Sequence, residues 1–146
     1  MTSRDGTTIR AWRNRGAPGS LPVVISNGLG TPPEAWPSIV GDPARYDAVG
    51  WYHRGTAGAP RPADPSHVRV QDHVDDLSYV RVPTTIVAGR WDILASMRRI
   101  IHAADEVGAS RLVVLRGSHF LPLEQPEEMA RLLDELAERA RLTVGP

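Results

Sequence analysis

Four short apolar runs, each followed by glycine or polar residues, constrain the fold of this chain more than any other feature. They cover residues 23–26, 48–51, 85–88 and 112–115. Apolar and polar residues hardly alternate within them, which is typical of strands that are covered on both faces of a parallel sheet. Parallel strands need crossover connections, which are usually helices. We therefore expect an α/β fold with a mostly parallel sheet flanked by helices.

Helical spacing occurs where that fold requires it. Apolar residues recur three and four positions apart over residues 70–77, 97–104 and 129–140. Ser96 stands where it would cap the second of these helices. Residues 7–12 alternate between apolar and polar instead, which predicts a half-exposed edge strand.

The composition narrows the class of protein. The 146 residues suffice for one domain, and no apolar stretch is long enough to span a bilayer. The first residues lack the basic segment and apolar core of a signal peptide, so we expect a soluble, cytoplasmic protein without a membrane partner. Seventeen acidic residues balance seventeen basic ones without a basic block, so we expect no nucleic-acid partner. The absence of cysteine excludes thiolate metal sites and a cysteine nucleophile.

Chemically useful side chains follow the apolar runs at the points where the strands should end. Asp92 comes after the third run and His119 after the fourth, while Asn27, Gly28 and Leu29 follow the first. Ligands of open α/β sheets bind beyond the carboxyl ends of the strands. A carboxylate there can orient an imidazole, and a glycine turn can direct a backbone N–H at an oxyanion. The sequence therefore predicts an acid–histidine pair formed by Asp92 and His119.

Four segments, in order along the chain, resemble motifs of the α/β-hydrolase fold family. "SNGLGTPPEAW" is similar to the family's oxyanion loop, and "YDAVGWYHRGTAGAPRP" is similar to the strand and loop that follow it. "VPTTIVAGRWDILAS" resembles the strand and turn with the catalytic acid. "GSHFLPLEQPEEMARLLDEL" resembles the loop with the catalytic histidine and the last helix. Together these segments cover most of the chain.

The resemblance implies a role for each residue at the strand ends. Asp92 would be the catalytic acid and His119 the base. Leu29 would donate an oxyanion hydrogen bond through its backbone N–H, from the loop that it shares with Gly28. The implied activity is the hydrolysis of a small ester-like substrate, without a cofactor or a metal ion.

The chain departs from the family where the nucleophile should be. The family carries its serine on a Gly-x-Ser-x-Gly elbow between a central strand and a helix, and no such motif occurs here. The segment that should contain it is missing between Leu77 and Ser78. Residues 1–77 and 78–146 would then be the two ends of one shortened domain, 1–146. We therefore expect weak hydrolase activity or none, and we expect exposed strand edges that favour homo-oligomers.

Other interpretations of the same residues stay open. Ser78 is the least unfavourable replacement for the nucleophile, because Ser118 should point away from the adjacent His119 and Ser26 ends a strand. The chain could instead be a non-catalytic remnant or an interaction protein. It could also be a fragment that another chain completes.

Histidines and aspartates gather in residues 67–76 and could suggest a metal site. They include His73 and Asp76, which flank the apolar stripe of the predicted helix. Because no further ligand set is evident, we interpret this segment as a solvated helix face and expect no metal. We expect Arg54 to stabilise its loop by hydrogen bonds rather than to take part in chemistry.

Overall fold

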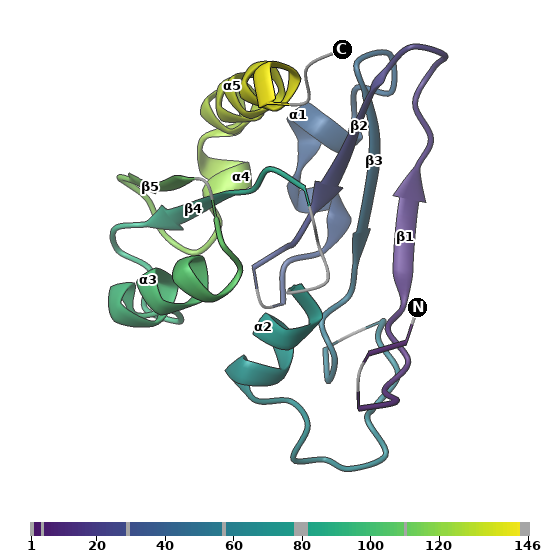
Figure 1. Cartoon of the computed structure of the whole chain (residues 1–146), viewed down its shortest axis with the longest axis vertical. Helices are drawn as coiled ribbons and strands as arrows, with labels where there is room; N and C mark the ends of the chain where they lie inside the picture. The colour runs from purple at the N-terminus through teal and green to yellow at the C-terminus, as the bar shows by residue number, and fades with distance from the viewer. Residues whose placement is uncertain are drawn as a thin grey trace.

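The computed structural model describes residues 2–3, 5–28, 30–56, 58–77, 82–109 and 111–143 (Figure 1). Strands and helices alternate along most of this chain, as expected for an α/β fold. The elements in order are β1 (Ala11–Asn14), β2 (Leu21–Ile25), the 3-10 helix η1 (Pro33–Ala35), α1 (Pro37–Val40), β3 (Tyr46–Trp51), α2 (Val70–Leu77), β4 (Thr85–Gly89), α3 (Met97–Glu106), β5 (Arg111–Leu115), α4 (Leu121–Glu124) and α5 (Pro126–Thr143).

The strands form two small sheets, whereas we expected one mostly parallel sheet. In the first sheet the order is β1–β3–β2, with β2 parallel and β1 antiparallel to β3. In the second sheet β4 pairs with β5 in parallel. Within the described residues, the chain between β3 and β4 forms α2 and loops, so it supplies no strand that could join β2 to β4. The expectation of a single continuous sheet was therefore wrong.

Most of the predicted elements lie close to their expected positions. The four apolar runs become β2, β3, β4 and β5, and the three helical patterns become α2, α3 and α5. The edge strand is displaced, because β1 begins at Ala11 and Thr8 forms only an isolated bridge with Thr2. Ser96 does occupy the N-cap position of α3, but its side chain makes no capping hydrogen bond, so the predicted side-chain cap was wrong.

The hydrophobic core of the first sheet lies against α1 and α5. Its buried members are Val23, Ile25, Ile39, Tyr46 and Ala48, and partly buried Leu133 of α5 packs against them. The side chain of Tyr46 is fully buried, and its hydroxyl donates a hydrogen bond to Asp134 of α5 at 3.2 Å. Helix α5 is therefore anchored to the first sheet by both apolar and polar contacts.

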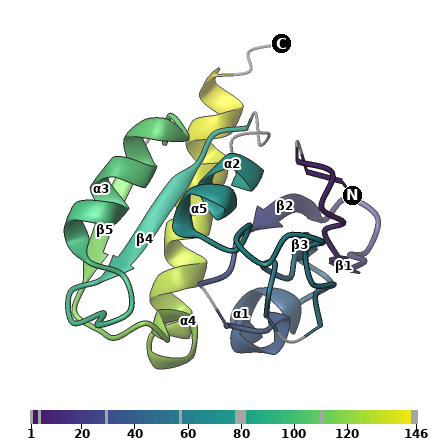
Figure 2. The ribbon, with the colours of Figure 1, turned by 90° about the horizontal axis from the view of Figure 1, so that it is seen from below.

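The same helix also contacts the second sheet, so it connects the two halves of the molecule. Arg111, the first residue of β5, forms an ion pair with Glu135 of α5 at 2.6 Å. Figure 2 shows α5 between the two groups of strands, with β4, β5 and α3 on one side and β2, β3 and α1 on the other. Among the described residues, no helix combines the length and apolar character needed to cross a membrane.

Candidate functional site

Asp92 and His119 lie on neighbouring loops beyond the ends of β4 and β5. Nδ1 of His119 is 2.8 Å from Oδ2 of Asp92, and the side chains are only 10% and 8% exposed, respectively. Backbone pairing continues beyond the strands, because the Arg90 N–H donates to the Leu115 carbonyl at 2.8 Å. The predicted proximity of Asp92 and His119 is thus confirmed, while their catalytic roles stay predictions.

A glycine at the end of β4 allows these two loops to approach each other. A Cβ atom at Gly89 would lie 2.1 Å from the Ser118 carbonyl oxygen and 2.6 Å from that of Gly117. These distances are far below van der Waals contact with backbone atoms that cannot easily move. A side chain at residue 89 would therefore separate the loops that hold the acid and the histidine.

The surroundings of Asp92 stabilise its ionised form. Burial disfavours its charge, but the hydrogen bond with His119 and those from the backbone N–H groups of Ala95 and Leu94 outweigh this effect. The two N–H groups reach Oδ1 at 3.0 and 2.8 Å. The pKa of Asp92 is therefore lowered from its ordinary value. An ionised carboxylate only accepts hydrogen bonds, so Nδ1 of His119 must donate the proton and Nε2 of neutral His119 is the basic atom.

Gly28 of the first half lies directly against this imidazole. A Cβ atom at Gly28 would be 2.8 Å from Nε2 of His119 and 3.0 Å from its Cε1. The loop after β2 and the loop after β5 therefore meet at the basic nitrogen, although they come from different sheets. Of the four residues to which the resemblance gives a role, Asp92, His119 and Gly28 lie together in space. The fourth, Leu29, lies outside the described residues.

A cavity of about 430 Å³ extends from this pair into the space between the two sheets. Gly28, Asp92 and His119 contribute to its lining. Most of its remaining wall is apolar and comes from β2, β4, α3 and α5. Representative wall residues are Ile25, Ile86, Ile100, Leu133 and Leu136.

The serines differ in their relation to this site. Ser118 donates its hydroxyl hydrogen bond to Glu124, which also accepts from the Ser118 backbone N–H at 2.8 Å. Its side chain is thus engaged away from the pair, as expected. Ser26 contributes to the cavity wall at the end of β2. Ser78, the least unfavourable replacement nucleophile, lies outside the described residues.

We compared the chain with known protein families, curated proteins and solved structures. No protein-family model, no curated protein and no solved structure matched the chain. The chemistry of the site is therefore argued below from its own residues.

Arg54 makes the contacts that we expected of it, but its main partner was missed. Its Nε and Nη2 atoms bind the two carboxylate oxygens of Asp76 at 3.0 and 2.7 Å, and Nη1 binds Asp5 at 2.5 Å. Both side chains of the Arg54–Asp76 pair are only 1% exposed. The interpretation of residues 67–76 as a solvated helix face is therefore wrong at Asp76. Among the described residues, no three metal-ligating side chains are grouped to hold an ion.

Two histidines that were not among the predicted site residues also line the cavity. The rings of His53 and His73 meet edge to face, with centroids 4.9 Å apart. Burial lowers the pKa of His53, and burial together with the neighbouring His53 lowers the pKa of His73 to about 4. Both rings are neutral at pH 7. In the sequence His53 follows a strand end and His73 lies in the histidine- and aspartate-rich residues 67–76, but neither position reveals that the two rings would meet.

The lowered pKa of His73 predicts that the protein loses stability in mild acid. In the unfolded chain this histidine takes up a proton near pH 6.5, whereas in the folded chain it does so only near pH 4. The stabilisation is complete above pH 6.5 and is lost as the pH falls towards 4. Because His73 is partly exposed, we expect this loss of stability to be about 2 kcal/mol, which is less than the free energy equivalent to the whole pKa shift.

This effect can be measured by urea unfolding at pH 7.5 and pH 4.5. His73→Gln should flatten the pH dependence of the unfolding free energy by about 2 kcal/mol. His102, whose side chain is 68% exposed on α3, supplies the matched control, and His102→Gln should change the unfolding free energy less than His73→Gln does. Equal effects of the two substitutions would show that His73 is not the group responsible.

Proposed function

We propose that this chain is a shortened α/β-hydrolase that slowly hydrolyses small ester-like substrates without a cofactor. The observation that carries the proposal is the Asp92–His119 hydrogen bond at 2.8 Å, with Gly28 placed against Nε2 of the imidazole. The resemblance of four ordered segments to that family supports the same assignment. The cavity that opens from the pair offers room for a small substrate.

In this proposal His119 acts as a general base towards water. Nε2 removes a proton from a water molecule as its oxygen attacks the ester carbonyl, which gives a tetrahedral intermediate. Asp92 remains ionised and stabilises the imidazolium that forms. The imidazolium then returns the proton to the departing alkoxide, and the products are a carboxylic acid and an alcohol. By resemblance, the Leu29 backbone N–H would stabilise the oxyanion.

The proposed activity is slow because the sequence contains no nucleophile elbow. An acyl-enzyme step divides one difficult reaction into two easier ones, and water attack forgoes this advantage. The elbow would also supply a second oxyanion donor. General base catalysis alone contributes typically about 10²–10⁴-fold to a rate.

Hydrolysis of p-nitrophenyl acetate by the purified chain tests the proposal. His119→Ala should reduce the rate above background by about tenfold or more, because it removes the base. Asp92→Asn should act in the same direction, since a neutral amide does not stabilise an imidazolium. His102→Ala is the matched control and should retain the parent rate. If His119→Ala hydrolyses the ester as fast as the parent chain, the proposal fails.

A serine-directed phosphonate distinguishes water attack from an unrecognised nucleophile. We expect no stoichiometric labelling of the parent chain. Labelling of Ser26, Ser78 or any other serine would show that a covalent route operates instead. Mass spectrometry of the intact chain and of its peptides gives the result directly.

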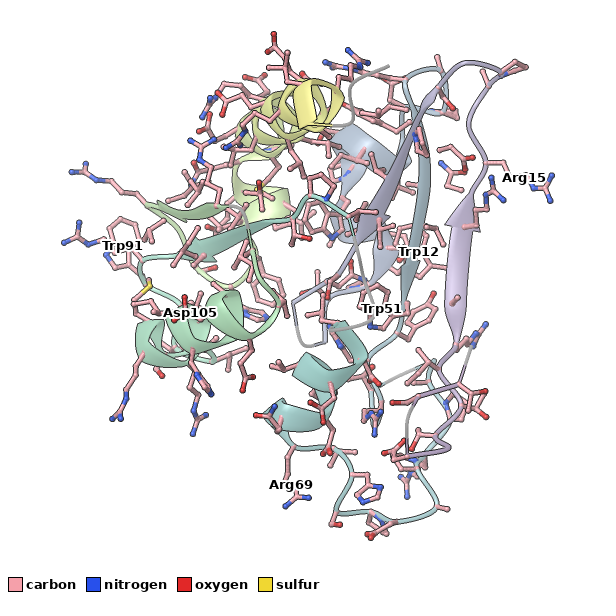
Figure 3. The ribbon with its side chains drawn as sticks, viewed as in Figure 1. Trp12, Arg15, Trp51, Arg69, Trp91 and Asp105 are labelled. Atoms are coloured by element: carbon pink, nitrogen blue, oxygen red, sulfur yellow. The ribbon has the colours of Figure 1, made fainter. Side chains whose placement is uncertain are left out.

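An interaction protein is the second candidate, and the strand edges favour it. In the part of the chain that the structure describes, β2 pairs with β3 alone and β4 pairs with β5 alone. Large apolar side chains are also exposed around the site, including Trp91, Ile93 and Phe120. Figure 3 shows Trp91 on the outer side of the second sheet. Unpaired edges and apolar patches favour association. We therefore expect light scattering to detect homo-oligomers, and a monodisperse monomer would contradict this candidate.

A further inference from the structure

The wall of the cavity contains buried polar atoms that have no hydrogen-bond partner in the part of the chain that the structure describes. Asn27 is 5% exposed, and neither its amide nitrogen nor its amide oxygen has a hydrogen-bond partner among the described residues. His53 is 7% exposed, and its Nδ1 likewise has no partner within the described ranges. Both residues line the cavity. A buried polar atom without a partner costs free energy, so such a group in a cavity wall points to a ligand atom that completes it.

The contacts of His53 determine which of its ring nitrogens donates a hydrogen bond and which accepts one. Its Nε2 lies 2.5 Å from the backbone carbonyl oxygen of Asn27, which only accepts, so Nε2 must carry the proton. Nδ1 of the neutral ring is then an acceptor. The Asn27 amide adds one acceptor and a donor, and the Trp51 Nε1–H is a further buried, unpaired donor in the same wall. A ligand hydroxyl, which donates one hydrogen bond and accepts others, can pair with one of the acceptors and with the donors of this set.

The charge of the surroundings favours an uncharged group. Burial lowers the pKa values of both His53 and His73, so neither ring is cationic at pH 7. The nearby Arg54 is already paired with two carboxylates, Asp76 and Asp5. Two charged side chains line other parts of the cavity: Asp92 is paired with His119, and Arg99 is exposed to solvent. A carboxylate or ammonium held by Asn27 and His53 would lose its hydration, and this is costly in a buried site.

The remaining wall is suited to hydrocarbon. It includes Ile25, Ile86, Val87, Ile100, Leu133 and Leu136. These side chains come from both halves of the molecule, so a chain lying between them would cover apolar surface of both. The volume of about 430 Å³ lies within the range of about 300–1,000 Å³ typical of small-molecule sites.

We propose that the cavity between the two sheets binds an uncharged amphiphile, with a hydroxyl group against Asn27 and His53 and an aliphatic chain between β2, β4, α3 and α5. This binding does not depend on hydrolysis at His119. It assigns a ligand class to a polar set that the proposed esterase mechanism does not use. A fatty alcohol is the simplest molecule of this class.

Titration with 1-octanol, compared with octanoate at pH 8, tests the proposal. Trp36 and Trp51 line the cavity, so saturable binding should change the intrinsic fluorescence. Trp51, labelled in Figure 3, is the last residue of β3 and is only 4% exposed. We expect octanol to bind at least about tenfold more tightly than octanoate, since only the alcohol enters without an uncompensated charge. Absence of saturable octanol binding, or equal binding of octanoate, would overturn the proposal.

Asn27→Leu distinguishes a loss of ligand binding from a loss of folding. Leucine of similar size removes two unpaired polar atoms, so the thermal midpoint should stay equal or rise while octanol affinity falls about tenfold. Ala103→Phe, on the cavity face of α3, should block the aliphatic chain and also weaken binding. Ile93→Ser, at an exposed site outside the lining, is the control for altered apolarity and should leave binding unchanged. Unaltered octanol affinity in Asn27→Leu would refute the assigned polar contact.

His119→Ala keeps this proposal distinct from the esterase. The variant should lose ester hydrolysis and retain the preference for octanol over octanoate. If it loses the preference as well, while Asn27→Leu keeps it, the hydroxyl group is held at His119 and the assignment to Asn27 and His53 is wrong.

Discussion

Asp76→Ala should reduce the free energy of unfolding by about 3–5 kcal/mol, because it leaves the Arg54 guanidinium buried without its main partner. Asp76 accepts two hydrogen bonds from Arg54 and a third from the Ser3 hydroxyl at 2.6 Å. Asp5 remains, but it binds only Nη1. The net stability of a domain is about 5–15 kcal/mol, so this one substitution can remove most of it. Urea unfolding followed by circular dichroism provides the measurement.

Asp47→Ala is the matched control for the loss of one carboxylate. Asp47 also pairs with an arginine, Arg13, but at the surface, where the two side chains are 23% and 54% exposed. Water and salt screen such a pair, so its removal should cost about 0–1 kcal/mol. If Asp47→Ala and Asp76→Ala reduced the free energy of unfolding by similar amounts, burial of the Arg54–Asp76 pair would not increase the cost of removing its carboxylate.

Much of the local structure and the central pair could be predicted from the sequence because both depend on short-range patterns. Unbroken apolar runs became β2 to β5, and helical spacing became α2, α3 and α5. Asp92 and His119 each follow one strand of a parallel pair. Consecutive parallel strands place their carboxyl ends side by side, so their proximity followed from topology alone.

The contacts that could not be predicted join residues far apart in the chain. An arginine at the end of β3 requires a carboxylate if it is buried, but the sequence offers many aspartates and no rule that selects Asp76. The contact between His53 and His73 could not be predicted either, because it depends on how α2 packs against the first sheet. The division into two sheets depends on whether β2 and β4 pair, which their own apolar sequences do not decide.

The position of the site makes it sensitive to the way in which the two halves are held together. Gly28 belongs to the first half, whereas Asp92 and His119 belong to the second. Helix α5 contacts both, through Leu133 and Asp134 on one side and Glu135 on the other. A weakened α5 should therefore affect stability and the site together.

Leu132→Ala should lower the free energy of unfolding by about 2–5 kcal/mol, because it removes a leucine side chain that is only 2% exposed. Leu132 also lines the cavity, so truncation enlarges a space that the surrounding side chains already leave unfilled. Part of the loss is the favourable free energy of moving the deleted methyl groups from water into the interior on folding, and part is the lost packing contacts. Thermal and urea unfolding of the variant measure the change.

Leu142→Ala tests whether burial, rather than helix propensity, causes that loss. It makes the same chemical change in the same helix, at a residue that is 80% exposed. Alanine is also the better helix former, so this variant should match or slightly exceed the parent stability. A large loss for Leu132→Ala with none for Leu142→Ala would show that α5 holds the two halves together through its buried face. Equal, small effects would mean that the sheets are joined by other contacts, and the dependence of the Gly28–His119 approach on α5 would be refuted.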